Sequence, residues 1–233
     1  MLSDALSFPR RGDDWLSTLL VGGVLTLLGV FVLPAFVVQG YLVRVLDRAA
    51  RRERTPPSFT QWGTLFVDGL KLTVVNVVYG LFVLVPLAVL LGSLVAFLPS
   101  GPMTAEGGAG GPPPAPADGG SGLVVFVAFL AAVGLFFLVV TYLLPAALAN
   151  FAIEGRLRAA FDVRTVLAGA FTSDYAVAWL LAIVVGIAGG LVGSLLAVAV
   201  VGIFVLFYVQ VASYYLVGRG FAAGLSKKRW SEP

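Results

Sequence analysis

Four long stretches of the chain contain no ionisable side chain. They cover residues 16–43, 72–98, 123–149 and 176–217. About 20 apolar residues are enough to cross roughly 30 Å of hydrocarbon as a helix. Only 12% of all residues are charged, about half of the share of roughly 25% that is usual in soluble domains. The sequence therefore predicts an all-α, polytopic integral membrane protein, with residues 1–233 forming a single membrane domain.

The lengths of these stretches indicate how often the chain crosses. Residues 16–43 contain Pro34, and we expect one tilted span with a kink at this proline. A re-entrant pair of half-helices is the alternative. Residues 176–217 would form a helix of about 63 Å, so they must turn back near residues 200–202. The prediction is thus about five transmembrane helices, over residues 16–43, 72–98, 123–149, 176–198 and 202–217.

Lysine and arginine are distributed unevenly between the connecting segments. Residues 99–122 contain neither and consist largely of glycine and proline, so we expect a disordered external loop that cannot offset its ordering entropy by burial. The segments after the first, third and fifth predicted spans are basic. Because basic segments stay on the cytoplasmic side, five crossings predict a multi-pass cell-membrane protein with its N-terminus outside and its C-terminus in the cytoplasm.

Two basic segments follow predicted spans, and we name them the first elbow (residues 44–54) and the second elbow (residues 156–164). Arginine binds phosphate through paired N–H groups, so these elbows are candidates for contact with anionic lipid headgroups or with a partner protein. The alternative is that the arginines only keep the loops inside. The candidate contact residues are Arg44, Arg48, Arg51, Arg52, Arg156 and Arg158. Helical spacing also predicts the ion pairs Asp47–Arg51, Asp68–Lys71 and Glu154–Arg158.

Small residues recur at helical spacing in the fourth predicted span. Gly186, Gly190 and Ser194, with Gly189 and Gly193 alongside, form overlapping stripes without bulky side chains, so another helix can approach closely. That helix could belong to the same chain or to a second copy in a homo-oligomer. The polar residues within the spans are amides and hydroxyls, such as Asn76 and Asn150, which more commonly tie helices together than carry ions.

The chain has no histidine and no cysteine. Disulfides, zinc–thiolate sites and histidine-based acid–base catalysis are therefore excluded. The remaining reactive residue types form no recognisable motif, so we predict no catalytic, cofactor-binding or metal-binding residues and no cofactor. No nucleic-acid-binding pattern is present either. A non-enzymatic protein in contact with membrane lipids is the reading that we favour.

The arrangement of a span, a basic elbow and a second span occurs twice. Pro34-Ala35-Phe36 precedes the first elbow and Pro145-Ala146-Ala147 precedes the second. Either an internal duplication or convergence on one way of re-entering the membrane would give this pattern. Because parallel repeats occur in transporters, a small transporter or permease subunit built from two-span repeats is the alternative function.

Several short blocks carry a family resemblance. They are GYLVRV at Gly40–Val45, WGTLFVDGLK at Trp62–Lys71, FAIEGR at Phe151–Arg156 and YLVGR at Tyr215–Arg219. On these blocks the chain resembles an archaeal, largely haloarchaeal, membrane-protein family catalogued as domain of unknown function 4013. The resemblance implies an integral protein of the archaeal cell membrane, and it implies no activity.

Overall fold

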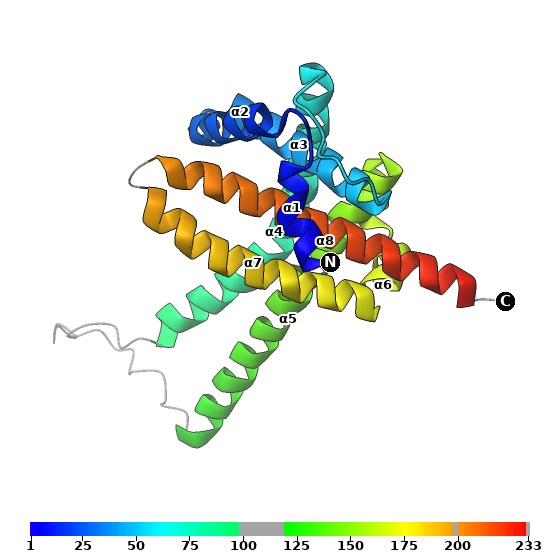
Figure 1. Cartoon of the computed structure of the whole chain (residues 1–233). Helices are drawn as coiled ribbons and strands as arrows, with labels where there is room; N and C mark the ends of the chain where they lie inside the picture. Colours follow the sequence, from blue (N-terminus) through cyan, green and yellow to red (C-terminus); the bar gives the residue numbers. More distant parts are fainter. Residues whose placement is uncertain (98–118, 198–199, 232–233) are drawn as a thin grey trace. The chain divides into compact units, whose positions relative to one another are not determined.

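The computed structural model describes residues 1–97, 119–197 and 200–231. In these residues every regular element is a helix, which confirms the predicted all-α class. The elements are α1 (Leu2–Ser7), the 3-10 helix η1 (Phe8–Arg10), α2 (Trp15–Leu27), the 3-10 helix η2 (Leu28–Val30), α3 (Val32–Ala50), α4 (Trp62–Phe97), α5 (Gly119–Glu154), the 3-10 helix η3 (Leu157–Phe161), α6 (Val163–Ala170), α7 (Ser173–Ala197) and α8 (Val201–Ser231) (Figure 1).

The structure confirms a multi-pass membrane protein. Four helical stretches are long and apolar enough to cross a membrane: Trp62–Gly92, Phe126–Glu154, Ser173–Ala197 and Val201–Lys227. A bent pair, residues 2–10 with residues 15–30, meets at 90° and would be a fifth span if the two parts cross as one. The loop predicted over residues 99–122 lies outside the described residues, except for its last four, which begin α5.

The first charge-free stretch forms two helices rather than the single kinked helix that we expected. The chain leaves helical geometry at Phe31 (φ −86°, ψ 127°), between η2 and α3. Pro34 lies in the first turn of α3, where its missing N–H is tolerated. If the helix continued backwards, the proline ring would clash with the carbonyl of Val30. The break therefore comes three residues before the proline.

Helix α2 runs antiparallel to α8. The ring of Phe8, just before α2, lies 4.4 Å from the ring of Tyr215, whereas Gly22 near the end of α2 lies against Phe207. As residue numbers increase along α2, the residue numbers of its contacts in α8 therefore decrease.

Helix α3 runs parallel to α8, because Tyr41 lies 5.6 Å from Phe207 and Leu46 lies against Gly218. Helices α2 and α3 also contact each other. They form an antiparallel hairpin whose open end, with Trp15 and Ala50, faces the C-terminal half of α8. The first charge-free stretch thus folds back on itself, with its two helices side by side.

The described contacts divide the chain into two units: Met1–Val77 with Tyr142–Pro233, and Val78–Thr141. In the first unit α8 is the central helix and contacts α1, α2, α3, α6 and α7. Of its most apolar stretch 44% is buried, compared with 6 to 11% for the other three candidate spans. The buried core gathers around Tyr41, Phe207 and Tyr215.

The second unit consists of the distal parts of α4 and α5. It carries an open apolar groove of about 520 Å³ lined by α4 residues around Pro86 and by Phe136 of α5. Helix α4 continues through Pro86, and α5 continues through Pro145. Both predicted spans are therefore continuous helices, and α4 begins ten residues earlier than predicted, at Trp62 rather than residue 72.

Within the first unit, α3 and α4 touch backbone to backbone. A Cβ atom on Gly40 would lie 1.8 Å from the carbonyl oxygen of Leu65, and one on Gly69 would lie 1.7 Å from that of Phe36. The contact is reciprocal, since each helix places a glycine against a carbonyl of the other. Only glycine permits this approach.

We therefore expect Gly40→Ala and Gly69→Ala to destabilise the protein by about 1 to 3 kcal/mol or more, because an inserted methyl forces two helix backbones apart. The measurement is the thermal midpoint of the purified protein in detergent. Gly80→Ala on the same helix α4 is the control, because no atom lies within 4 Å of the added methyl. Equal midpoints for Gly69→Ala and Gly80→Ala would contradict the expectation.

Candidate lipid-contacting surface at the two elbows

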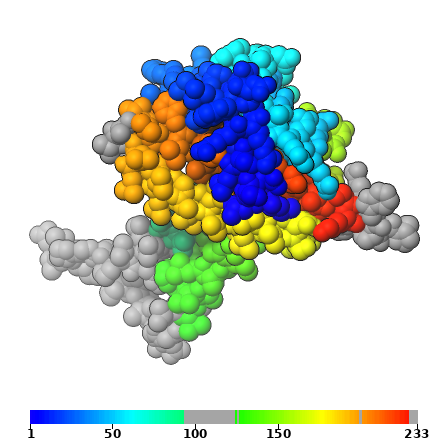
Figure 2. All heavy atoms as spheres, viewed as in Figure 1, coloured from blue at the N-terminus to red at the C-terminus, as the bar shows by residue number. Residues whose placement is uncertain are grey.

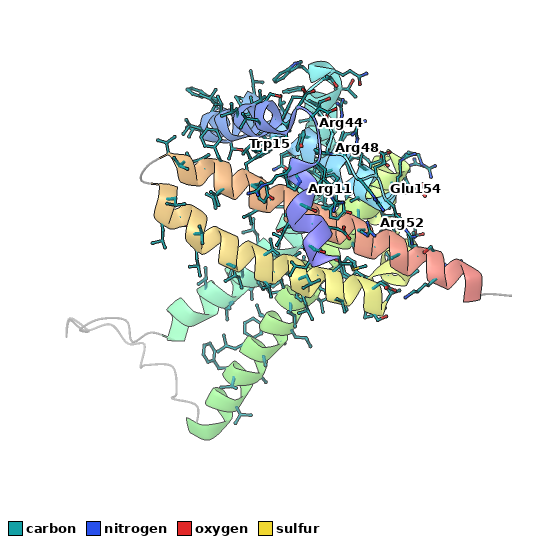
Figure 3. All side chains as sticks on the ribbon, viewed as in Figure 1. Arg11, Trp15, Arg44, Arg48, Arg52 and Glu154 are labelled. Atoms are coloured by element: carbon teal, nitrogen blue, oxygen red, sulfur yellow. The ribbon has the colours of Figure 1, made fainter. Side chains whose placement is uncertain are left out.

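Two arginines of the first elbow are engaged within the chain. Arg44 donates to the carbonyl oxygen of Thr60 (2.8 Å), and Arg48 donates to those of Thr55 (3.3 Å) and Pro56 (3.0 Å). The segment between α3 and α4 has no regular secondary structure, so most of its carbonyls have no helical partners. Helical spacing brings both guanidinium groups to one face of α3, and they bind the segment to this face (Figure 3).

Two further candidate arginines are held in ion pairs. Arg51 lies 2.8 Å from Asp47, as predicted, and this partner raises the pKa of Arg51. The predicted pair Asp68–Lys71 is confirmed at 3.4 Å. The predicted pair Glu154–Arg158 is wrong, because Glu154 pairs with Arg156 instead.

The reason for this changed pairing lies in the end of α5. The helix stops at Glu154, and Gly155 adopts a left-handed conformation (φ 67°). The four-residue helical spacing needed for a pair with Arg158 is therefore lost. The chain turns, and Arg156 folds back on the carboxylate.

In the elbows, the guanidinium groups of four exposed arginines form no hydrogen bond or ion pair with the residues that the structure describes, although the charge of Arg164 helps to lower the pKa of Asp162. They are Arg52, Arg54, Arg158 and Arg164. Arg52 and Arg158 are among the predicted contact residues, whereas Arg54 and Arg164 were not named individually. Nothing in the sequence separates these four from Arg44 and Arg48, because the difference depends on where the carbonyls of the elbow fall.

The second elbow is fixed by hydrogen bonds of one buried and one exposed side chain. Asn150, near the end of α5, donates to the carbonyl of Ala159 (2.8 Å) and is almost fully buried. Asp162 caps α6 by accepting from the backbone and the hydroxyl of Thr165, and these bonds lower the pKa of Asp162. Asn150 thus ties the end of a span to the elbow, as expected for an amide within a span.

Both elbows adjoin the C-terminal half of α8. Leu46 and Ala49 lie against Gly218, whereas Gly169 of α6 lies against Phe221. The N-terminal segment reaches the same end of the molecule, because Gly12 lies against Pro56 of the segment that follows the first elbow. In Figure 2 the N-terminal residues, in dark blue, cover part of α8.

Of the small residues predicted to pack in α7, Gly189 and Gly193 lie on the face that meets α8, whereas Gly186, Gly190 and Ser194 do not. Gly189 and Gly193 lie against Val209 and Leu206 of α8. Within the described residues, Gly186 and Gly190 face open space and Ser194 is exposed. The hairpin itself is as predicted, with α7 ending at Ala197 and α8 starting at Val201. Helix α8 extends to Ser231, well beyond the predicted end at residue 217.

A family model described as protein of unknown function (DUF4013) matches residues 25–198. The chain belongs to this family. The match covers α3 to α7 and includes both elbows. No curated protein and no solved structure matches the chain.

For the first elbow we expect Arg48→Ala to lower the free energy of unfolding by about 1 to 2 kcal/mol, because two carbonyls lose a charged donor at a half-exposed site. Protease susceptibility of residues 51–61 should rise in parallel. Arg54→Ala is the matched control, since Arg54 is exposed and unbonded within the described part of the chain. An equal effect of the two variants would count against the role given to Arg48.

Proposed function

We propose that this chain is a non-enzymatic integral membrane protein that binds anionic lipid headgroups on a basic cytoplasmic surface. The observation that carries the proposal is the group of four exposed arginines, two in each elbow, whose guanidinium groups are free within the described residues. Free guanidinium groups can form direct, paired hydrogen bonds with phosphate oxygens. Arg44 and Arg48 support the surface by holding the first elbow in place, whereas Arg51 and Arg156 are each paired with a nearby carboxylate.

The same proposal places both chain ends on the cytoplasmic side. The α2–α3 hairpin returns to the end at which it started, and Gly12 adjoins Pro56. Four spans then follow, so the C-terminus also lies on that side. All 15 lysines and arginines then belong to cytoplasmic or interfacial segments, which satisfies the positive-inside rule more fully than five crossings do. The cytoplasmic N-terminus replaces the external one that we expected from five crossings.

Single cysteines test this topology cleanly, because the natural chain has none. We expect Ser3→Cys and Ser226→Cys to react with an impermeant thiol reagent only after the membrane is opened. Thr104→Cys, between α4 and α5, should react in sealed cells. If Ser3→Cys reacts in sealed cells, the N-terminus is outside and the proposed topology is wrong.

Lipid retention tests the surface. The variant R52Q/R54Q/R158Q/R164Q should retain at least about fivefold less anionic lipid on purification, because each basic residue near a charged membrane contributes about 1 kcal/mol. Native mass spectrometry or lipid analysis of the purified protein gives the amount. The control D47N/R51Q/E154Q/R156Q also changes four residues of or beside the elbows but leaves the net charge unaltered. Unchanged retention in the first variant would reject the proposal.

The transporter alternative lacks comparable support. Thr73 and Asn76, two polar residues in the first unit's part of α4, donate to carbonyls of their own helix, those of Gly69 and Leu72. Side-chain donors that bond to carbonyls of their own helix are already engaged and are not presented to a solute. We therefore place this alternative second.

A further inference from the structure

A small cavity lies between the start of α2 and the segment that leads into α4. Its volume is about 230 Å³. The lining residues are Asp14, Ser17, Thr18 and Val21 on one side, and Ser58, Phe59, Thr60 and Trp62 on the other. One carboxylate, four hydroxyl-bearing residues and two aromatic rings therefore share a space large enough for a small polar group.

Two of these polar groups lack the partners that their positions would normally supply. Asp14 is the N-cap residue of α2, but its side chain accepts no hydrogen bond from the helix. It also forms no ion pair with any residue that the structure describes. An N-cap aspartate normally accepts from the second or third backbone N–H of its helix. Here the carboxylate remains available to a ligand.

Thr18 provides the second and independent observation. It is only 8% exposed and lines the cavity. Within the described residues its hydroxyl has no hydrogen-bond partner, although its backbone N–H bonds to Asp14. The hydroxyl oxygen is not among the fully buried atoms that lack a partner, so it is accessible from the cavity. It can therefore donate to or accept from a group that enters the cavity.

The opposite wall is aromatic and attracts positive charge. Phe59 is fixed by stacking on Tyr41, with ring centroids 4.4 Å apart, and Trp62 lies next to it with 51% of its surface exposed. The face of a tryptophan ring attracts cations. No lysine or arginine is among the lining residues, and Arg44 is bonded to the carbonyl of Thr60. No positively charged side chain that lines the cavity therefore neutralises the carboxylate of Asp14.

We propose that this cavity binds an ammonium group, with Asp14 as the counter-charge, Trp62 as the cation–π surface and Thr18 as a hydrogen-bonding partner. Trp62 is the first residue of the span Trp62–Gly92, and tryptophan at the end of a span lies at the membrane–water interface. The ammonium group therefore belongs either to a free small amine or to an amine-bearing lipid headgroup. The inference does not depend on the proposed function, which concerns phosphate groups at the elbows.

Titration of the whole purified protein with tetramethylammonium and with ethanolamine tests the site, with binding followed by calorimetry against sodium chloride at the same ionic strength. We expect saturable binding of at least one amine. Asp14→Asn should weaken it about tenfold or more, because a charged partner is lost. Asparagine is as good an N-cap as aspartate, so α2 should remain folded.

Three further variants make the result specific. Asp13→Asn is the matched control, since Asp13 is an exposed neighbouring carboxylate outside the lining, and it should leave binding unchanged. Thr18→Val keeps the side-chain shape and should weaken binding of ethanolamine. Trp62→Leu should weaken binding of tetramethylammonium about fivefold. Absence of amine binding, or equal effects of Asp13→Asn and Asp14→Asn, would overturn the proposal.

Nanodiscs distinguish the two sources of the ammonium group. Retention of a phosphatidylethanolamine over a phosphatidylglycerol of the same chains, lost in Asp14→Asn, would assign the site to a headgroup. Binding of soluble amines without this lipid preference would assign it to a free amine. Binding of glycerol or inositol as tight as that of the amines, with no effect of Asp14→Asn, would show a polyol site and contradict the proposal.

Discussion

Contact between helix backbones at glycine is the interaction on which the first unit depends. Lipid chains are as apolar as leucine, so burial of apolar side chains gives little force between helices, and close van der Waals packing has to supply it. Gly40 and Gly69 bring α3 onto α4, and Gly218 brings α3 onto α8. Gly22 and Gly23 likewise let α2 approach Phe207 and Phe204 of α8. Both arms of the hairpin therefore dock on the same central helix through glycines.

The arginines of the first elbow serve two purposes that cannot be separated by composition. Their charge keeps the elbow on one side of the membrane, and their N–H groups bond carbonyls that the segment between α3 and α4 cannot pair by itself. Arg44 and Arg48 thus support the fold, whereas Arg52 and Arg54 remain exposed. The arginines of this one basic segment therefore do not form a single binding surface, because some of them are hydrogen-bonded to backbone carbonyls of the chain.

Local patterns in the sequence predicted the helices, the α7–α8 turn and the pair Asp47–Arg51, because each depends on a few neighbouring residues. The long-range packing was not predictable in the same way. Pro34 coincides with a break, whereas Pro86 and Pro145 lie inside continuous helices. A proline permits a break, and contacts elsewhere decide whether it occurs. The face of α7 that meets α8 does carry glycines at helical spacing, Gly189 and Gly193, but spacing alone does not distinguish them from the neighbouring Gly186 and Gly190.

The composition of the hairpin tip argues for a structural rather than a conducting role. Helix α2, with 13 residues, is about 20 Å long, so in the proposed topology the turn at Phe31 lies within the hydrocarbon. A helix end at this depth leaves polar backbone groups that must be bonded, and η2 supplies a bond from the N–H of Phe31 to the carbonyl of Leu28 (2.8 Å). The tip carries only glycine and apolar side chains, with Val30 90% exposed. Re-entrant segments that conduct expose polar backbone to water. This one presents apolar side chains, which lipid chains can cover.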